Sequence, residues 1–339
     1  MRETVTFDDV LLEPQFSSID SRKLINLSSQ LDPEYILQIP IISSPMDTVT
    51  EWQMAQTMTN LGGLGIIHRY NTPEEQAMLV KKALDGDTDR LVGAAIGVSD
   101  DFIDRACALH DAGVKVLCVD VAHGHHVLVK HALTVLRNTF GSAIHIMAGN
   151  IATLKAFNDL ADWGADSIRV GIGGGSICST RIQTGHGVPT LQSVIDCAAS
   201  DRPARLIADG GMKMPGDIVK ALGAGADFVI LGSLLAGTNE SPGKVEMRDG
   251  KRVKSYRGMA SREAQYKWRG RAASVEGVAH HVDYRGSVED VIHNLCRGIK
   301  SGMSYSGART LSEFRSKALF IKQTTCGLAE SGTHIKTRF

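Results

Sequence analysis

The segment GIGGGSICSTR (171–181) surrounds a cysteine with residue types that suit covalent chemistry. Four glycines within five positions disfavour both helix and strand, so we expect a mobile loop. Cys178 lies on it beside the hydroxyls of Ser176, Ser179 and Thr180. A core cysteine is usually a small apolar residue, whereas a cysteine on a polar, accessible loop can act as a nucleophile. The residues alone leave both interpretations of Cys178 open.

Two further glycine turns have the composition of a phosphate site. The sequences ADGG (208–211) and LGS (231–233) each end an apolar run. Glycines let backbone N–H groups approach a phosphate closely, and barrel enzymes often bind phosphate at their last two strand ends. The alternative is a pair of tight turns without a ligand. The sequence favours the phosphate site.

The elements that must position these loops are eight short runs rich in Val, Ile and Leu. Such runs are typical of strands buried on both faces of a parallel sheet. They cover residues 39–45, 63–68, 90–97, 114–121, 143–149, 165–173, 204–211 and 226–233. Segments of helical period, such as 74–85 and 154–164, separate them. This alternation predicts a single-domain (β/α)8 barrel. A doubly wound open sheet is the alternative, but no GxGxxG follows the first strand.

Three turns into the predicted strands resemble one another. They read DAGVKVLCVD (111–120), DWGADSIRVG (162–171) and GAGADFVILG (223–232). In each, a glycine follows a helix at the position where a left-handed cap is expected. The similarity indicates repeated barrel units.

Composition excludes several classes of protein. The 339 residues include 37 basic and 37 acidic side chains and only 5% aromatic residues, which argues against a nucleic-acid binder. The six cysteines are scattered without a CxxC, so no zinc site is indicated. The sequence contains no apolar signal core and no run of about 18 apolar residues. We expect a cytoplasmic protein with free thiols, away from membranes.

The sequence resembles the inosine-monophosphate dehydrogenase and guanosine-monophosphate reductase family over nearly its whole length. The matching segments are TFDDVLLEP (6–14), ISSPMDTVTE (42–51), GIIHR (65–69), VDVAHGH (119–125), AGNIAT (148–153), GIGGGSICSTR (171–181, called the cysteine loop below), ADGG…PGDI (208–218), LGSLLAG (231–237) and YRGM (256–259). They follow the order and approximate spacing of the family. The resemblance implies a (β/α)8 barrel, in agreement with the strand pattern.

The resemblance also bears on which reaction is catalysed. Dehydrogenases of the family usually carry a CBS insertion after the second barrel strand, and here only residues 71–89 join strands two and three. They also carry a long flap with an Arg-Tyr pair that activates water; the flap here, about 244–286, is short and contains no such dipeptide. PGDI and the overall length are similar to the reductase, whereas LGSLLAG and YRGMAS are closer to dehydrogenases. Arg269 and Arg271 are present in the flap, so a water-activating base at a different position remains an alternative.

The favoured interpretation is therefore GMP reductase, which converts GMP and NADPH to IMP, ammonia and NADP. The alternatives are an IMP dehydrogenase without CBS modules, which oxidises IMP to XMP with NAD, and a nucleotide-binding barrel that has lost catalysis. By resemblance, Cys178 attacks the purine C2, and Thr180 and Glu276 form the proton-transfer pair. The catalytic loop would span about 171–190.

The resemblance also implies ligand contacts. The substrate residues are Ser176, Gly211, Gly232 and Ser233 for the phosphate, Asp209 for the ribose hydroxyls, and Met46, Met259 and Gly258 for the base, with Ser44 and Tyr256 nearby. Asp209 could instead cap the following helix. The cofactor residues are Asp120, Asn150, Arg169 and Gly171, with Arg69 at the cofactor or the substrate. Carbonyls at Gly171, Gly173 and Cys178 form a candidate site for a monovalent cation such as K+. The family implies a homotetramer.

Overall fold

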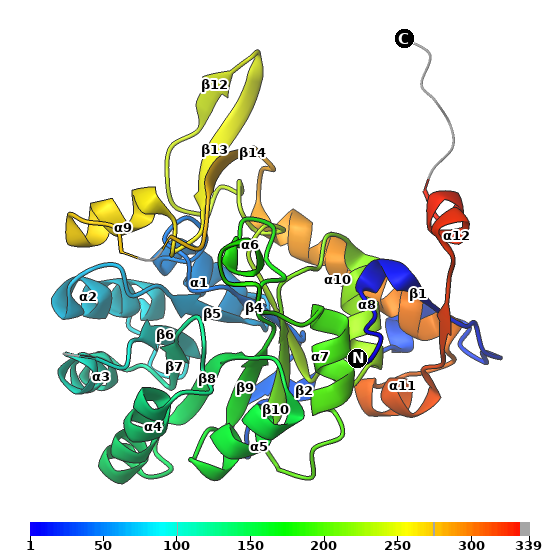
Figure 1. Cartoon of the computed structure of the whole chain (residues 1–339), viewed down its shortest axis with the longest axis horizontal. Helices are drawn as coiled ribbons and strands as arrows, with labels where there is room; N and C mark the ends of the chain where they lie inside the picture. Colours follow the sequence, from blue (N-terminus) through cyan, green and yellow to red (C-terminus); the bar gives the residue numbers. More distant parts are fainter. Residues whose placement is uncertain (100, 274, 333–339) are drawn as a thin grey trace.

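Eight parallel strands form a closed barrel in the computed structural model, which describes residues 1–99, 101–273 and 275–332 (Figure 1). Their order around the barrel is β10-β11-β4-β5-β6-β7-β8-β9. The strands are β4 (Ile41–Ser43), β5 (Leu64–Ile67), β6 (Val92–Ile96), β7 (Val116–Asp120), β8 (His145–Ile151), β9 (Ser167–Val170), β10 (Arg205–Asp209) and β11 (Phe228–Leu231). Seven of them lie within one of the predicted apolar runs, and β8 overlaps its run and extends two residues beyond it, which confirms the predicted (β/α)8 barrel in a single domain.

Helices cover the outside of the barrel between successive strands. They are α1 (Trp52–Asn60), α2 (Pro73–Leu84), α3 (Phe102–Asp111), α4 (Val127–Phe140), α5 (Leu154–Asp162), α7 (Thr190–Cys197), α8 (Pro215–Gly223) and α10 (Val288–Tyr305). Local sequence begins several of them: Thr72 and Glu75 form a capping box before α2, with proline at its first position. Gly113, Gly164 and Gly225 have φ values of +99°, +106° and +117°, so the three similar turns adopt the expected left-handed conformation.

Alternate residues of the strands fill the interior of the barrel, and the others pack against the helices. Ile42, Ile66, Cys118, Met147 and Ile207 belong to the interior cluster and are fully buried. This two-sided burial explains why each strand reads as a continuous apolar run.

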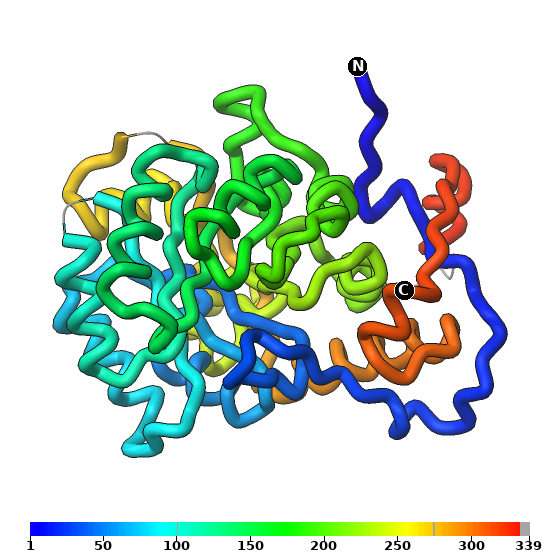
Figure 2. The backbone as a smooth tube through the Cα atoms, turned by 90° about the horizontal axis from the view of Figure 1, so that it is seen from below, coloured from blue at the N-terminus to red at the C-terminus, as the bar shows by residue number. Residues whose placement is uncertain are grey.

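Short elements close the amino end of the barrel. A hairpin of β2 (Ser29–Gln30) and β3 (Ile36–Leu37) inserts Leu31 and Leu37 into the interior cluster. The N-terminal segment lies beside the C-terminal elements (Figure 2). It contains η1 (Phe7–Asp9), β1 (Val10–Leu12) and η2 (Arg22–Leu24), and the C-terminal elements are α11 (Leu311–Lys317), β15 (Phe320–Lys322) and α12 (Thr325–Glu330). β1 and β15 pair antiparallel.

Two additions stand at the opposite, carboxyl end. The cysteine loop continues into α6 (Thr180–Thr184), and the flap consists of β12 (Glu246–Arg248), β13 (Lys251–Arg257), α9 (Arg262–Arg269) and β14 (Ala279–Asp283) (Figure 1). Only α2 and its connecting loops join β5 to β6, so the chain has no CBS insertion there. Across the described ranges, no helix combines the length and apolarity needed to cross a bilayer.

Candidate active site

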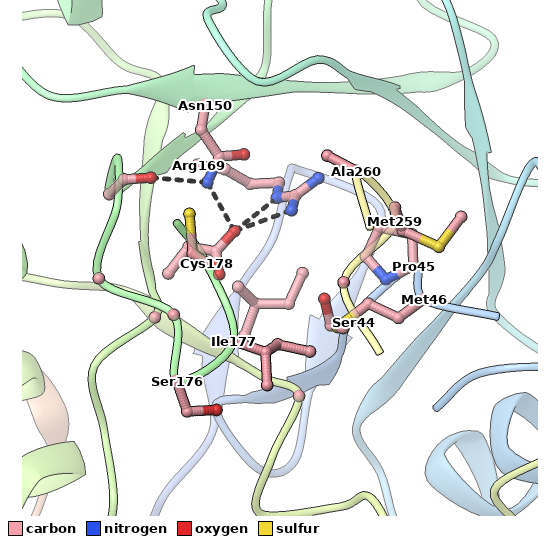
Figure 3. Close-up of a pocket in the computed structure, with 18 of the residues that line it drawn as sticks. Ser44, Pro45, Met46, Asn150, Arg169, Ser176, Ile177, Cys178, Met259 and Ala260 are labelled. Carbon is pink, nitrogen blue, oxygen red and sulfur yellow. Dashed lines mark hydrogen bonds and ion pairs between the residues drawn. The ribbon is translucent and has the colours of Figure 1, made fainter. Parts of the chain in front are cut away.

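One pocket of about 320 Å³ at the carboxyl end of the barrel collects the predicted site residues (Figure 3). Its lining includes, from the barrel strand ends, Ser44, Met46, Asp120, Asn150, Arg169, Asp209, Gly211, Gly232 and Ser233. The cysteine loop contributes Gly171, Gly173, Ser176, Cys178 and Thr180, and the flap contributes Tyr256, Gly258, Met259 and Glu276. Residues distant in sequence thus meet at the end of the barrel where barrel enzymes carry their chemistry.

A short chain of hydrogen bonds links the cysteine to a carboxylate of the flap. The Cys178 thiol donates to Thr180 Oγ1 at 3.2 Å, and the Thr180 hydroxyl donates to Glu276 Oε2 at 2.7 Å. The backbone holds this geometry, because Ser179 N donates to the Glu276 carbonyl at 2.9 Å and Cys178 forms a β-bridge with Gly277. The arrangement connects a nucleophile to a proton acceptor through a hydroxyl, which suits proton transfer at a group bound to the sulfur.

Arg169 is the centre of a buried ionic cluster beneath the pocket. Its side chain is 6% exposed; Nη1 donates to Asp120 Oδ1 at 2.6 Å, and Nε and Nη2 donate to Asp209 Oδ2 at 3.0 and 2.8 Å. Burial alone would lower the pKa of Arg169, but the Asp209 and Asp120 carboxylates raise it well above its usual value. Nearby Cys118 is a neutral thiol, because burial raises its pKa to about 11.

Asp209 is oriented by three donors on a single oxygen. Besides Arg169, Asn150 Nδ2 donates to Asp209 Oδ2 at 2.8 Å and to the Gly171 carbonyl at 2.8 Å (Figure 3). All three donors bind Oδ2, which leaves Asp209 Oδ1 as an acceptor for ligand hydroxyls. Asp209 lies in this network within the pocket, the position expected of a ligand contact.

Tyr256 lies at the predicted phosphate residues. Its hydroxyl lies near Ser176 and Ser233, and burial raises the pKa of Tyr256 to about 12, so the phenol is neutral. The sequence placed Tyr256 near the base, and that position stays a prediction; in the structure the residue lies between Met46 and the predicted phosphate residues. Gly232 leaves room for this tyrosine, because a Cβ there would lie 3.1 Å from both the Tyr256 hydroxyl and Met46 Sδ.

Contacts from the base of the flap hold the apolar side of the pocket. Met259 Sδ accepts a hydrogen bond from Asp47 N at 3.3 Å, and Asp47 forms a close ion pair with Arg257. Arg257 N also donates to Thr48 Oγ1 at 3.2 Å. Met46 and Met259 therefore lie close together on one side of the pocket, where the flap is tied to the barrel (Figure 3). Asp47 and Arg257 were missed as positioning residues, although both stand in the matched segments.

The far end of the pocket contains Arg69, Tyr70 and Asp120. Arg69 Nη2 donates to the Asp120 carbonyl at 3.2 Å. Arg69 Nε is buried, has no hydrogen-bond partner among the described residues, and lies 3.8 Å from Asp120 Oδ2. An orphaned buried donor fits a polar group of a ligand such as a nicotinamide cofactor. Tyr70 was not singled out from the sequence; its position directly after Arg69 at a strand end was the available signal.

The candidate cation site stays a prediction. The Gly171 carbonyl already accepts from Asn150, and the Gly175 carbonyl accepts from Cys178 N at 3.1 Å. Gly171 has a strict steric requirement, because its φ is +151° and a Cβ would lie 1.9 Å from the Asp209 carbonyl oxygen.

Comparisons with known proteins agree with this geometry. The family model described as IMP dehydrogenase / GMP reductase domain matches residues 4–334. The chain is 33% identical to a GMP reductase of Leishmania major, covering 98% of this chain and 97% of the relative. It is 38% identical to an inosine-5'-monophosphate dehydrogenase of Cryptosporidium parvum, covering 97% and 94%.

A solved structure matches the whole barrel. The crystal structure of GMP reductase C318A from Trypanosoma brucei in complex with guanosine 5'-monophosphate superposes with a TM-score of 0.93 at 32% identity, covering 99% of this chain and 98% of that one. The coverage extends over the barrel, the cysteine loop and the flap. The chain therefore belongs to the IMP dehydrogenase / GMP reductase family of oxidoreductases.

Proposed function

We propose that the protein is a GMP reductase, which converts GMP to IMP and ammonia with NADPH as the reductant. The observation that carries this proposal is the hydrogen-bonded series from Cys178 through Thr180 to Glu276. A deaminating enzyme must deliver a proton to a poor leaving group. This series connects the Glu276 carboxylate, through the Thr180 hydroxyl, to the sulfur that would hold the purine. The short flap contains no Arg-Tyr pair for activating water.

The first step forms the Cys178 Sγ–C2 bond and releases the exocyclic amine. Cys178 attacks as the thiolate, with its proton passed through Thr180 to Glu276. Glu276 then returns a proton through the Thr180 hydroxyl to the amine, which leaves as ammonia. Bound NADPH would supply the hydride that adds to C2 and restores the thiolate. The overall reaction, GMP + NADPH + H+ → IMP + NADP+ + NH3, balances in atoms and charge.

The remaining residues hold the substrate against this series. Asp209 Oδ1 accepts the ribose hydroxyls, while Arg169 and Asn150 hold the carboxylate in place. Ser176, Ser233 and Tyr256, with the backbone at Gly211, bind the phosphate, and Met46 and Met259 contact the purine. Arg69, Tyr70 and Asp120 border the space for the cofactor. Flap and loop together exclude water, which would otherwise hydrolyse the intermediate to XMP.

IMP dehydrogenase is the second candidate, and the 38% identity to the Cryptosporidium parvum dehydrogenase is the observation that favours it. Arg269 and Arg271 are exposed on the flap and would then be examined as water-activating groups. The resemblance implies a homotetramer under either function, with NADPH as the cofactor of the reductase and NAD as the cofactor of the dehydrogenase.

Product analysis separates the two candidates. The purified protein is incubated with GMP and NADPH, and in parallel with IMP and NAD, and the nucleotides and ammonia are quantified. The proposal predicts equimolar IMP and ammonia from the first pair, formed at a severely reduced rate by Glu276→Gln. XMP from the second pair, with no ammonia from the first, would establish the dehydrogenase.

A further inference from the structure

A tryptophan on the flap packs on the barrel at the edge of the active site. Trp268, on α9, stacks on Tyr70 with ring centroids 5.7 Å apart and planes at 13°. Tyr70 lies in the loop after β5 and lines the active-site pocket. We propose that Trp268 is a positioning residue: by docking the flap on Tyr70 it places Glu276 beside Thr180 and Cys178. The inference rests on the proposed function for the role of Glu276.

The barrel side of this contact is anchored by a buried arginine. Arg105 is 3% exposed and donates to Gln76 Oε1 at 2.8 Å and to the Asn71 carbonyl at 2.9 Å. Its guanidinium carbon also lies 6.0 Å from the centre of the Trp268 ring. Trp268 therefore packs on a loop that Arg105 holds by hydrogen bonds. It is stabilised by stacking on Tyr70 and by cation–π attraction to Arg105.

The flap side of the contact is connected to the catalytic carboxylate by hydrogen bonds. Gln265, one turn before Trp268, donates to the Ala260 carbonyl at 3.0 Å and accepts from Ala273 N at 2.9 Å. Glu276 N donates to the same Ala260 carbonyl at 3.1 Å. Helix α9 and the segment that carries Glu276 therefore move as one unit, so a contact at Trp268 constrains Glu276.

Contacts of Arg257 and Met259 anchor the base of the flap to the barrel, but the partner of the Glu276 segment at the active site is itself a loop. Glu276 is paired with Ser179 and Gly277 with Cys178, all within or against the glycine-rich segment. A cavity of about 320 Å³, lined by Glu75 and Met78 of α2 and by Lys267 of α9, interrupts packing between the two helices. Figure 1 shows α9 lying over the α2 side of the barrel. Tyr70, on which Trp268 stacks, also lines this cavity, so the stack lies at its edge.

The proposal predicts a loss in turnover rather than in nucleotide binding. Most contacts to the ribose and phosphate come from barrel strands and the cysteine loop, so Trp268→Ala should leave the GMP dissociation constant within about two-fold. The kcat should fall by about ten-fold or more, because small displacements of a proton-transfer group are costly. Trp268→Phe keeps a ring on Tyr70 and should stay within about three-fold of wild type.

A double-mutant cycle tests whether Trp268 acts through Glu276. In the Glu276→Gln background, Trp268→Ala should cause no further loss of kcat, because the group it positions is already disabled. The matched control is Tyr266→Ala, on the same helix but 54% exposed, which should behave as wild type. An equal loss in both backgrounds, or a raised NADPH KM with kcat retained, would overturn the proposal.

A second readout does not depend on the reaction catalysed. Release of the flap frees the backbone at Cys178, so iodoacetamide should alkylate Cys178 at least about five-fold faster in Trp268→Ala, measured by peptide mass spectrometry. An unchanged alkylation rate overturns the docking role even if the wild type reduces GMP. Conversely, faster alkylation without ammonia release by the wild type refutes the proposed function and leaves the docking intact. If the alanine variant fails to fold, Trp268→Leu takes its place in both experiments.

Discussion

Replacing Arg169 with methionine should expose how much the ionic cluster under the pocket contributes. Methionine is shorter than arginine but has a similar volume, so the change removes the charge and the donors with little change in packing volume. It leaves Asp120 and Asp209, whose side chains are 18% and 15% exposed, without their common cation. Breaking a buried ion pair by removing one partner costs about 3–5 kcal/mol. We expect the free energy of unfolding to fall by about that amount.

The chain offers a matched control. Arg202 also binds two aspartates, Asp162 at 2.7 Å and Asp201 at 2.6 Å, but on the surface. Solvent screens such pairs, so Arg202→Met should change stability little. Arg169→Lys keeps the charge but cannot reach both carboxylates with a planar fork, and should fall between the two.

Urea unfolding followed by circular dichroism measures all three variants against wild type. The same proteins are titrated with GMP, because a disoriented Asp209 should bind ribose poorly and raise the GMP dissociation constant by about ten-fold or more. Equal, small effects of Arg169→Met and Arg202→Met on both stability and binding would refute the reasoning, since they would mean that burial does not strengthen the Arg169 pairs.

Other predictions concern single contacts. Tyr256→Phe removes the hydroxyl near Ser176 and Ser233, for which a hydrogen bond to the phosphate is proposed. Loss of one hydrogen bond costs roughly 1–1.5 kcal/mol, so the GMP KM should rise by about five- to ten-fold in steady-state assays; an unchanged KM would exclude a phosphate role. Gly171→Ala should abolish activity or folding, whereas Gly175→Ala, whose Cβ would meet only Cys178 Cβ at 3.4 Å, should fold with native circular dichroism; equal tolerance would contradict the geometry. At the amino end of the barrel, Asp32 Oδ2 lies 2.7 Å from His145 Nδ1. Burial raises the pKa of Asp32, but the hydrogen bonds from His145, Glu34 and Tyr35 outweigh burial, so the pKa is lowered overall. A lowered folded pKa stabilises the fold above the unfolded pKa of about 3.9, and this contribution is lost as the pH falls through the folded value. Asp32→Asn should therefore reduce the urea midpoint at pH 7, and the difference from wild type should shrink below about pH 4; a deficit independent of pH would assign it to packing.

The barrel was predictable because its physical signals are local. A strand buried on both faces must be apolar at every position, and a glycine such as Gly113 marks the left-handed turn before it. Because the eight parallel strands close into a barrel, their carboxyl ends lie together at one end of it. The flap strands lack this signal: β13 reads KRVKSYR, and its burial is mixed, so its pairing with β12 and β14 was not anticipated.

The candidate site was predictable as a set of residues but not as a network. That Arg169 bridges Asp120 and Asp209 depends on the register in which Arg169 lies beside Ile207 of β10, and no local pattern encodes that register. The Tyr70–Trp268 stack joins segments far apart in sequence, each unremarkable by itself. Such contacts emerge only when loops of different strands are placed over the same end of the barrel.

The most direct test of the central claim follows the hydrogen that reaches C2. GMP carrying ¹⁵N in its exocyclic amine is incubated with NADPH deuterated at the transferred position of the nicotinamide, and the products are analysed by mass spectrometry. The account predicts IMP containing one deuterium and an equal amount of ¹⁵N-ammonia, with neither product formed by Cys178→Ala. IMP without deuterium, or full activity in Cys178→Ala, would contradict covalent reductive deamination at this site.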